Sequence, residues 1–306
     1  MTWFRLHFSF FVTLLAVLFA PFAMGLIAEE PTQFNWPINR GFPELRGLTS
    51  TFGESREDHF HNGVDIAGLN DEIKPIAPGT FLFTRNAEDD PFAPLIGPGN
   101  FVIVDHGKGW WSGYYHLAKS GKARSGPVDA NTVIGYSGNT GHSVGAHLHF
   151  FISKDYGKTM VNPLIVLPGT VDQNPPEIGA LTIVTPTTKT SVPPGKVSRV
   201  RLSQAFPVYI TVTDPGLERN TNRGVYELRW KLNSAPEEVR TFQKLVVHDG
   251  EWKLDGKAFD DVFGLGLYSL GKLGFQNGTN TLRVVAVDQA GNKSETEFQL
   301  DVQRMY

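Results

Sequence analysis

The chain has 306 residues, of which 41% are hydrophobic, and a formal net charge of -3. This length fits two domains with real cores, and the absence of excess positive charge argues against nucleic acid as the partner. The chain contains no cysteine, which excludes disulfides, thiolate metal sites and a lipid-modified cysteine anchor.

The first residues indicate a leader for export. Arg5 supplies a positive charge before an apolar run over 6–22, and Ala23-Met24-Gly25 forms a small-x-small pattern, which predicts cleavage near Gly25 or Ala28. We therefore expect a signal peptide over residues 1–28. An uncleaved membrane anchor is the alternative, because the run approaches the ~20 residues that a spanning helix needs. After cleavage we expect an exported protein, periplasmic or extracellular, with no stable membrane span.

A linker and a first domain follow from the distribution of glycine and proline. Residues 29–44 are polar and contain prolines, which indicates a linker. Over 45–168, short apolar runs are separated by glycine and proline, which predicts strands joined by tight turns. No long amphipathic helix is expected, so this domain is predicted to be all-β or nearly so. The clearest predicted strands are 79–83, 100–105 and 133–136.

A second linker is expected at 169–176, where Pro175 and Pro176 cannot donate backbone hydrogen bonds. Beyond it, alternating apolar and polar residues over 177–306 predict a β-sandwich. The segment Ala-Val-Asp-Gln-Ala-Gly-Asn at 286–292 resembles many bacterial immunoglobulin-like modules. The fold class is therefore predicted to be mostly all-β, a β-rich domain followed by an immunoglobulin-like β-sandwich. Strands are expected within 181–184, 207–212, 225–230, 281–287 and 296–302.

Two histidines at alternate positions, His147 and His149, are the strongest chemical signal. Residues two apart in a strand point to the same face, so both imidazoles project together while the side chains between them enter a core. Far upstream, His61 and Asp65 add an imidazole and a carboxylate, and His116 lies between the two segments. In a chain without cysteine, such nitrogen and oxygen ligands favour a zinc site.

The spacing of His61 and Asp65 requires a bend. A straight strand would place their Cα atoms about 13 Å apart, too far to share one ion. Gly63 is the residue that permits the bend. His59 offers an alternative ligand, and a buried histidine network without any ion is the other interpretation. Two further histidines have no special spacing and are expected in turns: His106 and His142.

Ordered motifs from Leu48 to Pro163 resemble the lysostaphin-like, LytM-type zinc endopeptidases. Single motifs are common, but here their order and spacing agree throughout. The family has a β-rich fold and cleaves peptide bonds, mostly in peptidoglycan. The matching pieces are Phe52-Gly53, His-Asn-Gly-Val-Asp-Ile-Ala at 61–67, Ile-Ala-Pro-Gly at 76–79, Val-Asp-His-Gly at 104–107, Tyr-His-Leu at 115–117, 134–141 and His-Leu-His-Phe at 147–150.

The resemblance implies one zinc ion held by His61, Asp65 and His149, with His116 and His147 as paired catalytic histidines. One of the pair would accept a proton while the other steadies the oxyanion. All five positions are present, so the resemblance implies an active, secreted zinc endopeptidase that hydrolyses peptide bonds of bacterial peptidoglycan by metal-activated water.

Other functions remain open at this point. Some relatives lack ligands and activate other wall hydrolases, so a non-catalytic exported regulator or binder of such enzymes is the alternative, and a protease of protein substrates is a third. The second domain has no ligand cluster, and it is expected to bind the wall or an envelope protein, to position the protease or to cover its groove. His59 has no counterpart in the family. Four aromatic residues are expected either to line the groove or to pack in the core: Trp110, Trp111, Tyr114 and Tyr115.

Overall fold

The structure, a computed structural model, describes residues 33–305 except 41–43, 45, 90, 91, 93, 122–124 and 218–220. The expected signal peptide over 1–28 lies outside the described residues. Within these ranges the only helices are the four-residue α1 (Pro163–Val166) and α2 (Phe259–Val262), and none is long and apolar enough to cross a membrane. The prediction of a nearly all-β chain is confirmed.

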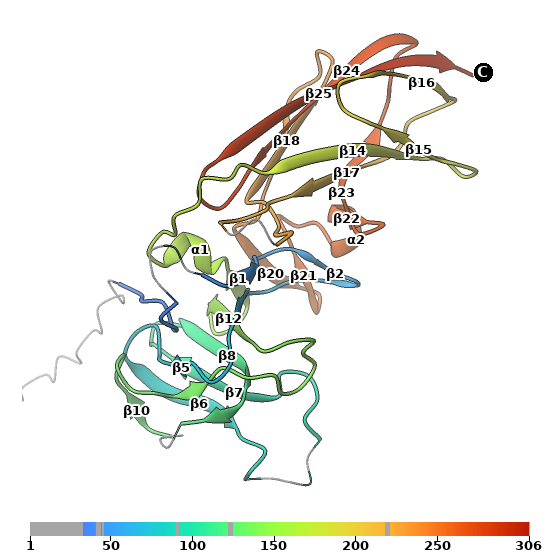
Figure 1. Cartoon of the computed structure of the whole chain (residues 1–306). Coiled ribbons are helices and arrows are strands. Elements are labelled where there is room, and N and C mark those ends of the chain that lie inside the picture. Colours follow the sequence, from blue (N-terminus) through green and yellow to red (C-terminus); the bar gives the residue numbers. More distant parts are fainter. Residues whose placement is uncertain are drawn as a thin grey trace, which may run out of the picture.

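The first sheet (Figure 1) has ten antiparallel strands, and its strands contain His116, His147 and His149. Its path runs β10-β6-β7-β8-β12-β13-β20-β21, with β4 pairing β12 and β1 beside that path. The strands are β1 (Leu48–Ser50), β4 (Val64–Ala67), β6 (Gly79–Arg85), β7 (Asn100–Asp105), β8 (Trp111–Leu117), β10 (Pro127–Val128), β12 (His147–Lys154), β13 (Thr159–Val161), β20 (Lys244–His248) and β21 (Glu251–Lys253).

Short strands complete this part of the chain. β5 (Glu72–Ile73), β11 (Gly135–Tyr136) and β9 (Lys119–Ser120) form a three-stranded sheet, and β2 (Ser55–Arg56) pairs with β3 (His59–Phe60). The predicted strands 79–83 and 100–105 lie within β6 and β7, whereas the run 133–136 is strand only in β11.

Alternating side chains build the first core. Val102 and Val104 of β7 are fully buried together with Leu148 of β12, since every second residue of these strands faces the same side. Phe34 and Ile38, from the region where a linker is expected, also lie in this core. The core therefore extends upstream of the first strand.

Two five-stranded sheets form the second part and pack face to face (Figure 1). One has the order β15-β14-β17-β23-β22 and the other β16-β25-β24-β18-β19, and apolar residues of both sheets share one core. A β-rich second domain is thereby confirmed, and its immunoglobulin-like character stays a prediction. The strands are β14 (Glu177–Val184), β15 (Lys189–Val192), β16 (Val197–Leu202), β17 (Phe206–Thr213), β18 (Glu227–Leu232), β19 (Glu238–Thr241), β22 (Phe263–Gly264), β23 (Leu267–Leu273), β24 (Gly278–Val287) and β25 (Lys293–Arg304).

Each part of the chain contributes residues to the sheet or the core of the other. The β20–β21 hairpin comes from the second part of the sequence, yet β20 pairs with β13 and extends the first sheet (Figure 1). Conversely, Phe52 and Phe60 come from the first part but are buried in the core of the second. The segment between these two phenylalanines leads directly into the histidine motif at His61.

Candidate metal centre

Adjacent strands place Asp65 and His149 opposite each other. β12 pairs antiparallel with β4, and in this register His149 lies directly across from Asp65, while His147 lies across from Ala67. Directly opposed residues on one face of such a pair have Cβ atoms about 4.5–5.5 Å apart. The buried Leu148 points to the other side, as the alternation predicts. The sheet register therefore brings together two residues that are 84 positions apart in sequence.

His61 reaches the same place because the chain bends after β3. A Cβ atom on Gly63 would lie 2.3 Å from the Phe150 carbonyl oxygen and 3.2 Å from Cε1 of His149. Glycine is needed here because the backbones approach closely. The sequence predicts this bend at Gly63, and the structure adds that the missing side chain makes room for β12.

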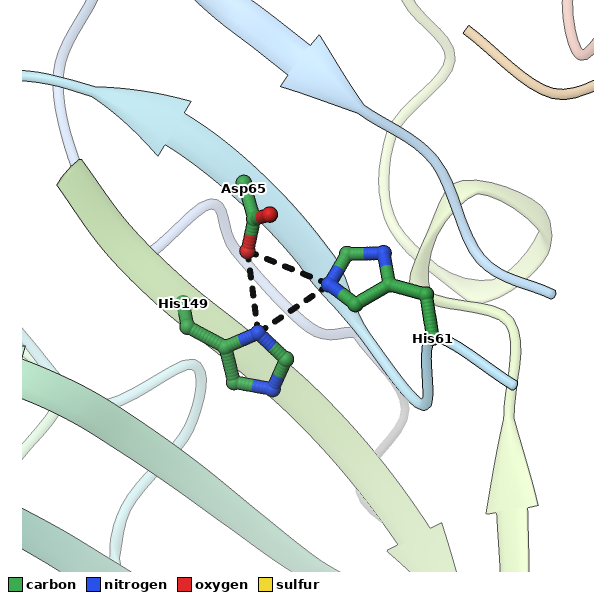
Figure 2. Close-up of side chains that lie close together, drawn as sticks. All are labelled: His61, Asp65 and His149. Carbon is green, nitrogen blue, oxygen red and sulfur yellow. Dashed lines mark hydrogen bonds and ion pairs between the residues drawn. The ribbon is translucent and has the colours of Figure 1, made fainter. Parts of the chain in front are cut away.

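The ligand atoms of His61, Asp65 and His149 converge (Figure 2). Nε2 of His61 lies 3.1 Å from Oδ1 of Asp65 and 3.1 Å from Nδ1 of His149, and Nδ1 of His149 lies 2.9 Å from the same Oδ1. Ligands about 2.0 Å from a tetrahedral ion lie roughly 3.3 Å apart. These three side chains can therefore hold one metal ion.

Hydrogen bonds behind the rings fix which nitrogen faces the cluster. Nδ1 of His61 lies 2.8 Å from the Thr51 carbonyl oxygen, and Nε2 of His149 lies 3.1 Å from Oδ1 of Asn62. Each of these nitrogens must carry the proton, since its partner only accepts. When each ring is neutral, the opposite nitrogens, which face Asp65, hold lone pairs that a metal ion can accept. The donor set therefore fits a metal.

A cationic side chain holds the other oxygen of the carboxylate. Arg56 donates from Nη2 to Oδ2 of Asp65 at 2.7 Å and to Oγ of Ser50 at 2.6 Å. Oδ2 is therefore occupied, and Oδ1 is the oxygen that faces the two imidazoles. Such contacts orient a ligand and are part of a metal site as much as the ligands themselves.

His116 and His147 lie beside the cluster. Their ring centroids are 4.9 Å apart, and Nε2 of His147 lies 3.6 Å from Oδ1 of Asp65. Nδ1 of His116 donates to the Thr140 carbonyl at 2.9 Å, and Nδ1 of His147 donates to the Gly145 carbonyl at 2.7 Å. Both rings thus keep Nε2 available, and the structure brings together all five residues that the sequence analysis names.

The backbone at His116 is strained. Its φ angle is +59°, in the left-handed region that side chains other than glycine rarely adopt. The register between β7 and β8 shifts between the pairs Asn100–Leu117 and Val102–Tyr114, so the strand carries a bulge here. Bulges re-aim side chains and recur beside functional sites, and at this one the centroid of the His116 ring lies 4.9 Å from that of the His147 ring.

Burial and charge set the protonation of the cluster. Burial raises the pKa of Asp65, but the neighbouring His61 and His149 outweigh it and hold this pKa well below its usual range. Burial lowers the pKa of His149 to about 4 and also lowers the pKa of His116. The carboxylate is therefore charged and these two imidazoles are neutral near pH 7, the forms that bind metal and accept protons.

Three other histidines named from the sequence lie outside the cluster. His59 is exposed and pairs with Asp58 at 2.7 Å. His106 lies in the turn between β7 and β8, where its nitrogens contact the Pro78 carbonyl and Oγ of Ser112. His142 lies in a bend.

The four aromatic residues named from the sequence lie in different surroundings. Tyr114 is fully buried in the first core, and Trp110 packs against that core. Trp111 contacts Tyr156 edge to face. Tyr115 stacks on His149 with ring centroids 5.5 Å apart, so it is the one of the four that touches a candidate ligand.

A second acidic group in the described part of the chain is a weaker metal candidate. Asp172, Asp214 and Asp288 have carboxylate oxygens close together. Arg223 already donates to Asp172 at 2.5 Å and to Asp214 at 2.9 Å. The guanidinium supplies the positive charge that an ion would supply, so this group fastens Asp172, in the expected linker, to Arg223 and Asp214 of the second domain.

Several functional contacts carry no signal in the sequence. The acceptors of His61, His116 and His147 are backbone carbonyls, which every residue has. Arg56 and Asn62 lie close to His61 in sequence, and their nearness is the one hint that could have identified them.

Comparison with known proteins agrees with this geometry. Residues 59–163 match the model of Peptidase family M23, and a second family model, which carries no description, matches residues 175–303. Peptidoglycan DD-endopeptidase ShyA of Vibrio cholerae is 35% identical over 123 residues, covering 39% of this chain and 25% of ShyA. An uncharacterized metalloprotease of Haemophilus influenzae is 43% identical over 111 residues, covering 36% of this chain and 22% of the relative.

The chain thus spans about a quarter of the length of these relatives. Among solved structures, the catalytic domain of the antimicrobial peptidase lysostaphin from Staphylococcus simulans is 22% identical with a TM-score of 0.35, covering 42% of this chain and 96% of that domain. The family match spans all five residues of the cluster, from His61 to His149. Residues 59–163 therefore form a domain of peptidase family M23, the family of the LytM and lysostaphin type.

Proposed function

We propose that the protein is an exported zinc endopeptidase that hydrolyses peptide bonds of bacterial peptidoglycan. The observation that carries the proposal is the arrangement of the four imidazoles. Each of them is bonded through one nitrogen to a carbonyl or amide oxygen, which leaves the other nitrogen available beside Asp65. A buried histidine network without an ion would need extra protons on the nitrogens that face Asp65, and burial, which lowers the pKa of His149 and of His116, disfavours protons on these two rings.

His61, Asp65 and His149 would hold the ion. Zinc bound there would polarise the scissile carbonyl and lower the pKa of an attacking water. Three protein ligands leave a coordination position open, which is the pattern of catalytic rather than structural zinc. The remaining work falls to side chains of this chain.

His116 and His147 would move the protons. One Nε2 would accept the proton of the attacking water, and the other would donate to the developing oxyanion or to the leaving amine. The bonds from Nδ1 to the Thr140 and Gly145 carbonyls hold each ring in the tautomer that can do so. A general acid or base positioned in this way is worth about 10²–10⁴-fold in rate.

The test is digestion of purified peptidoglycan by protein lacking residues 1–28, followed by mass spectrometry of the released muropeptides. We expect new amino and carboxyl ends from one type of peptide bond, loss of activity with a chelator, recovery with Zn²⁺, and no activity in His149→Ala. Protein that binds zinc and cleaves only unfolded protein substrates would contradict the wall substrate. Protein that binds zinc and cleaves neither would contradict the enzymatic proposal and support a regulatory role.

A further inference from the structure

The segment that presents His61 is held by the second domain. Phe60, which precedes His61, packs against Phe259 and Phe263 with ring centroids 5.3 and 6.0 Å apart. A Cβ atom on Gly53 would lie 2.6 Å from Cδ1 of Phe242, so this contact is close. Both ends of the segment 52–60 are therefore anchored in the core of the second domain.

Glu54 is the polar centre of this anchorage. Its Oε1 accepts from the backbone N–H of Thr51 at 2.5 Å and from the backbone N–H of Gly224 at 2.8 Å, and the Thr51 hydroxyl lies 2.9 Å away. Its Oε2 accepts from the Ser50 hydroxyl. The Glu54 side chain is only 12% exposed. One carboxylate thus joins the first domain to the second through Gly224.

The contacts of Glu54 lead directly to the candidate ligand. Thr51, whose N–H Glu54 accepts, is the residue whose carbonyl accepts the Nδ1 proton of His61. The backbone carbonyl of Glu54 also accepts from the N–H of His61 at 2.8 Å. Moving Glu54 would therefore move the acceptor that sets the His61 tautomer.

We infer that Glu54 is a positioning residue through which the second domain holds His61 ready for the metal. The inference rests on the proposed function in taking His61 as a metal ligand. The backbone at Gly224 packs directly against Glu54, since a Cβ atom there would lie 2.7 Å from Cγ of Glu54. The second domain is then part of the metal site's support rather than a spacer alone.

Three variants test the inference in the full chain lacking residues 1–28. Glu54→Ala removes the acceptor of Thr51 and Gly224, and we expect Co²⁺ and Zn²⁺ affinity to fall about 10–100-fold, as for other residues that orient a ligand. Glu54→Gln keeps one oxygen for both N–H groups and should recover most of the affinity. Gly224→Ala pushes on Glu54 from the second domain alone and should fall between the two.

Asn162→Ala is the matched control. Asn162 is also buried and also bridges the two parts, donating to the Phe242 carbonyl at 2.9 Å, but it touches neither Thr51 nor His61. It should lower stability without changing metal affinity or the absorption bands of bound Co²⁺. Equal weakening in Asn162→Ala and Glu54→Ala would overturn the inference, because loosening of the interface would then explain both.

A second measurement keeps the inference separate from the proposed function. Nitrogen NMR of metal-free protein reports the His61 tautomer directly, and we expect a fixed Nδ1–H form in the wild type that is lost in Glu54→Ala. Unchanged tautomer and unchanged Co²⁺ spectrum in a folded Glu54→Ala protein would overturn the role of Glu54. Failure to cleave peptidoglycan with these signals intact would overturn the proposed function alone. If Glu54→Ala does not fold, the metal affinities of Gly224→Ala and Glu54→Gln are compared instead. Weaker binding in Gly224→Ala supports the role of Glu54, and equal binding overturns it.

Discussion

His116 and His147 lie with their ring centroids 4.9 Å apart, although they come from different strands, and each donates its Nδ1 proton to a backbone carbonyl. Neither ring can rotate without losing that bond. Both rings are therefore held in fixed orientations, with Nδ1 turned to the backbone and Nε2 free of that bond, before any substrate arrives. Such preorganisation is the condition under which proton transfer is fast.

Removing either ring should separate catalysis from metal binding. We expect His116→Ala and His147→Ala to bind one equivalent of zinc and to lose about 10²–10⁴-fold in kcat, because neither side chain is needed to hold the ion. Metal analysis of the purified variants together with muropeptide release measures both quantities. Wild-type turnover in His116→Ala would refute its catalytic role.

Removing the carboxylate should abolish both properties. Asp65→Asn leaves the shape of the side chain but removes the charge that lies between His61 and His149. We expect zinc to be absent after dialysis and activity to be undetectable, whereas the chelated wild type should recover on adding Zn²⁺. Retained stoichiometric zinc in Asp65→Asn would show that the ion sits elsewhere.

The sequence could predict what depends on local periodicity. A short apolar run marks β7, and the spacing of His147 and His149 places both on one face of β12, because strand side chains alternate with a period of two. The family motifs then supply the set of five residues.

Contacts made by the backbone and between distant segments could not be predicted in this way. The carbonyls of Thr51 and Thr140 fix two tautomers, yet a carbonyl has no residue signature. The pairing of β20 with β13 joins segments more than 80 positions apart, and an alternating pattern names a strand but not its neighbour. The left-handed backbone at His116 belongs to the bulge between β7 and β8, and no side-chain pattern in the sequence predicts that bulge.

The strain at His116 makes a prediction of its own. Glycine adopts positive φ without the steric cost that alanine has, so at this position His116→Gly should be more stable than His116→Ala. We expect the free energy of unfolding of His116→Gly to exceed that of His116→Ala by about 1 kcal/mol, whereas alanine is usually the more stabilising of the two residues. Urea denaturation of both variants, with zinc bound, measures it. A more stable alanine variant would contradict the left-handed backbone.

The close approach at Gly63 predicts a large effect from a single methyl group. Gly63→Ala would force β4 away from the Phe150 carbonyl, and we expect a loss of about 1–3 kcal/mol together with weakened zinc binding. Gly169→Ala is the control, since a Cβ atom there meets nothing within 4 Å. Thermal denaturation and zinc titration of the pair should differ only for Gly63→Ala. If Gly63→Ala and Gly169→Ala behaved alike, the backbone at Gly63 would not approach β12 as closely as the structure shows.

His106 predicts a pH dependence of stability that is independent of the metal site. Burial lowers its pKa below the ordinary 6.5, while its nitrogens contact the Pro78 carbonyl and Oγ of Ser112. The unfolded chain therefore takes up a proton at this residue as pH falls below about 6.5, and the folded chain does so only at lower pH. The stability that the neutral ring supplies is thus fully present above about pH 6.5. It is lost as the pH falls from there through the lower pKa of His106 in the folded protein.

We expect His106→Asn to be less stable than the wild type near neutral pH but to lose less stability on acidification, so that the two curves converge. Urea denaturation at several pH values between about 8 and 5 measures the difference, in which contributions from the metal site cancel. The exposed His248→Asn serves as the control and should follow the wild-type curve. Parallel curves for His106→Asn and the wild type would mean that His106 is as readily protonated in the folded protein as in the unfolded chain.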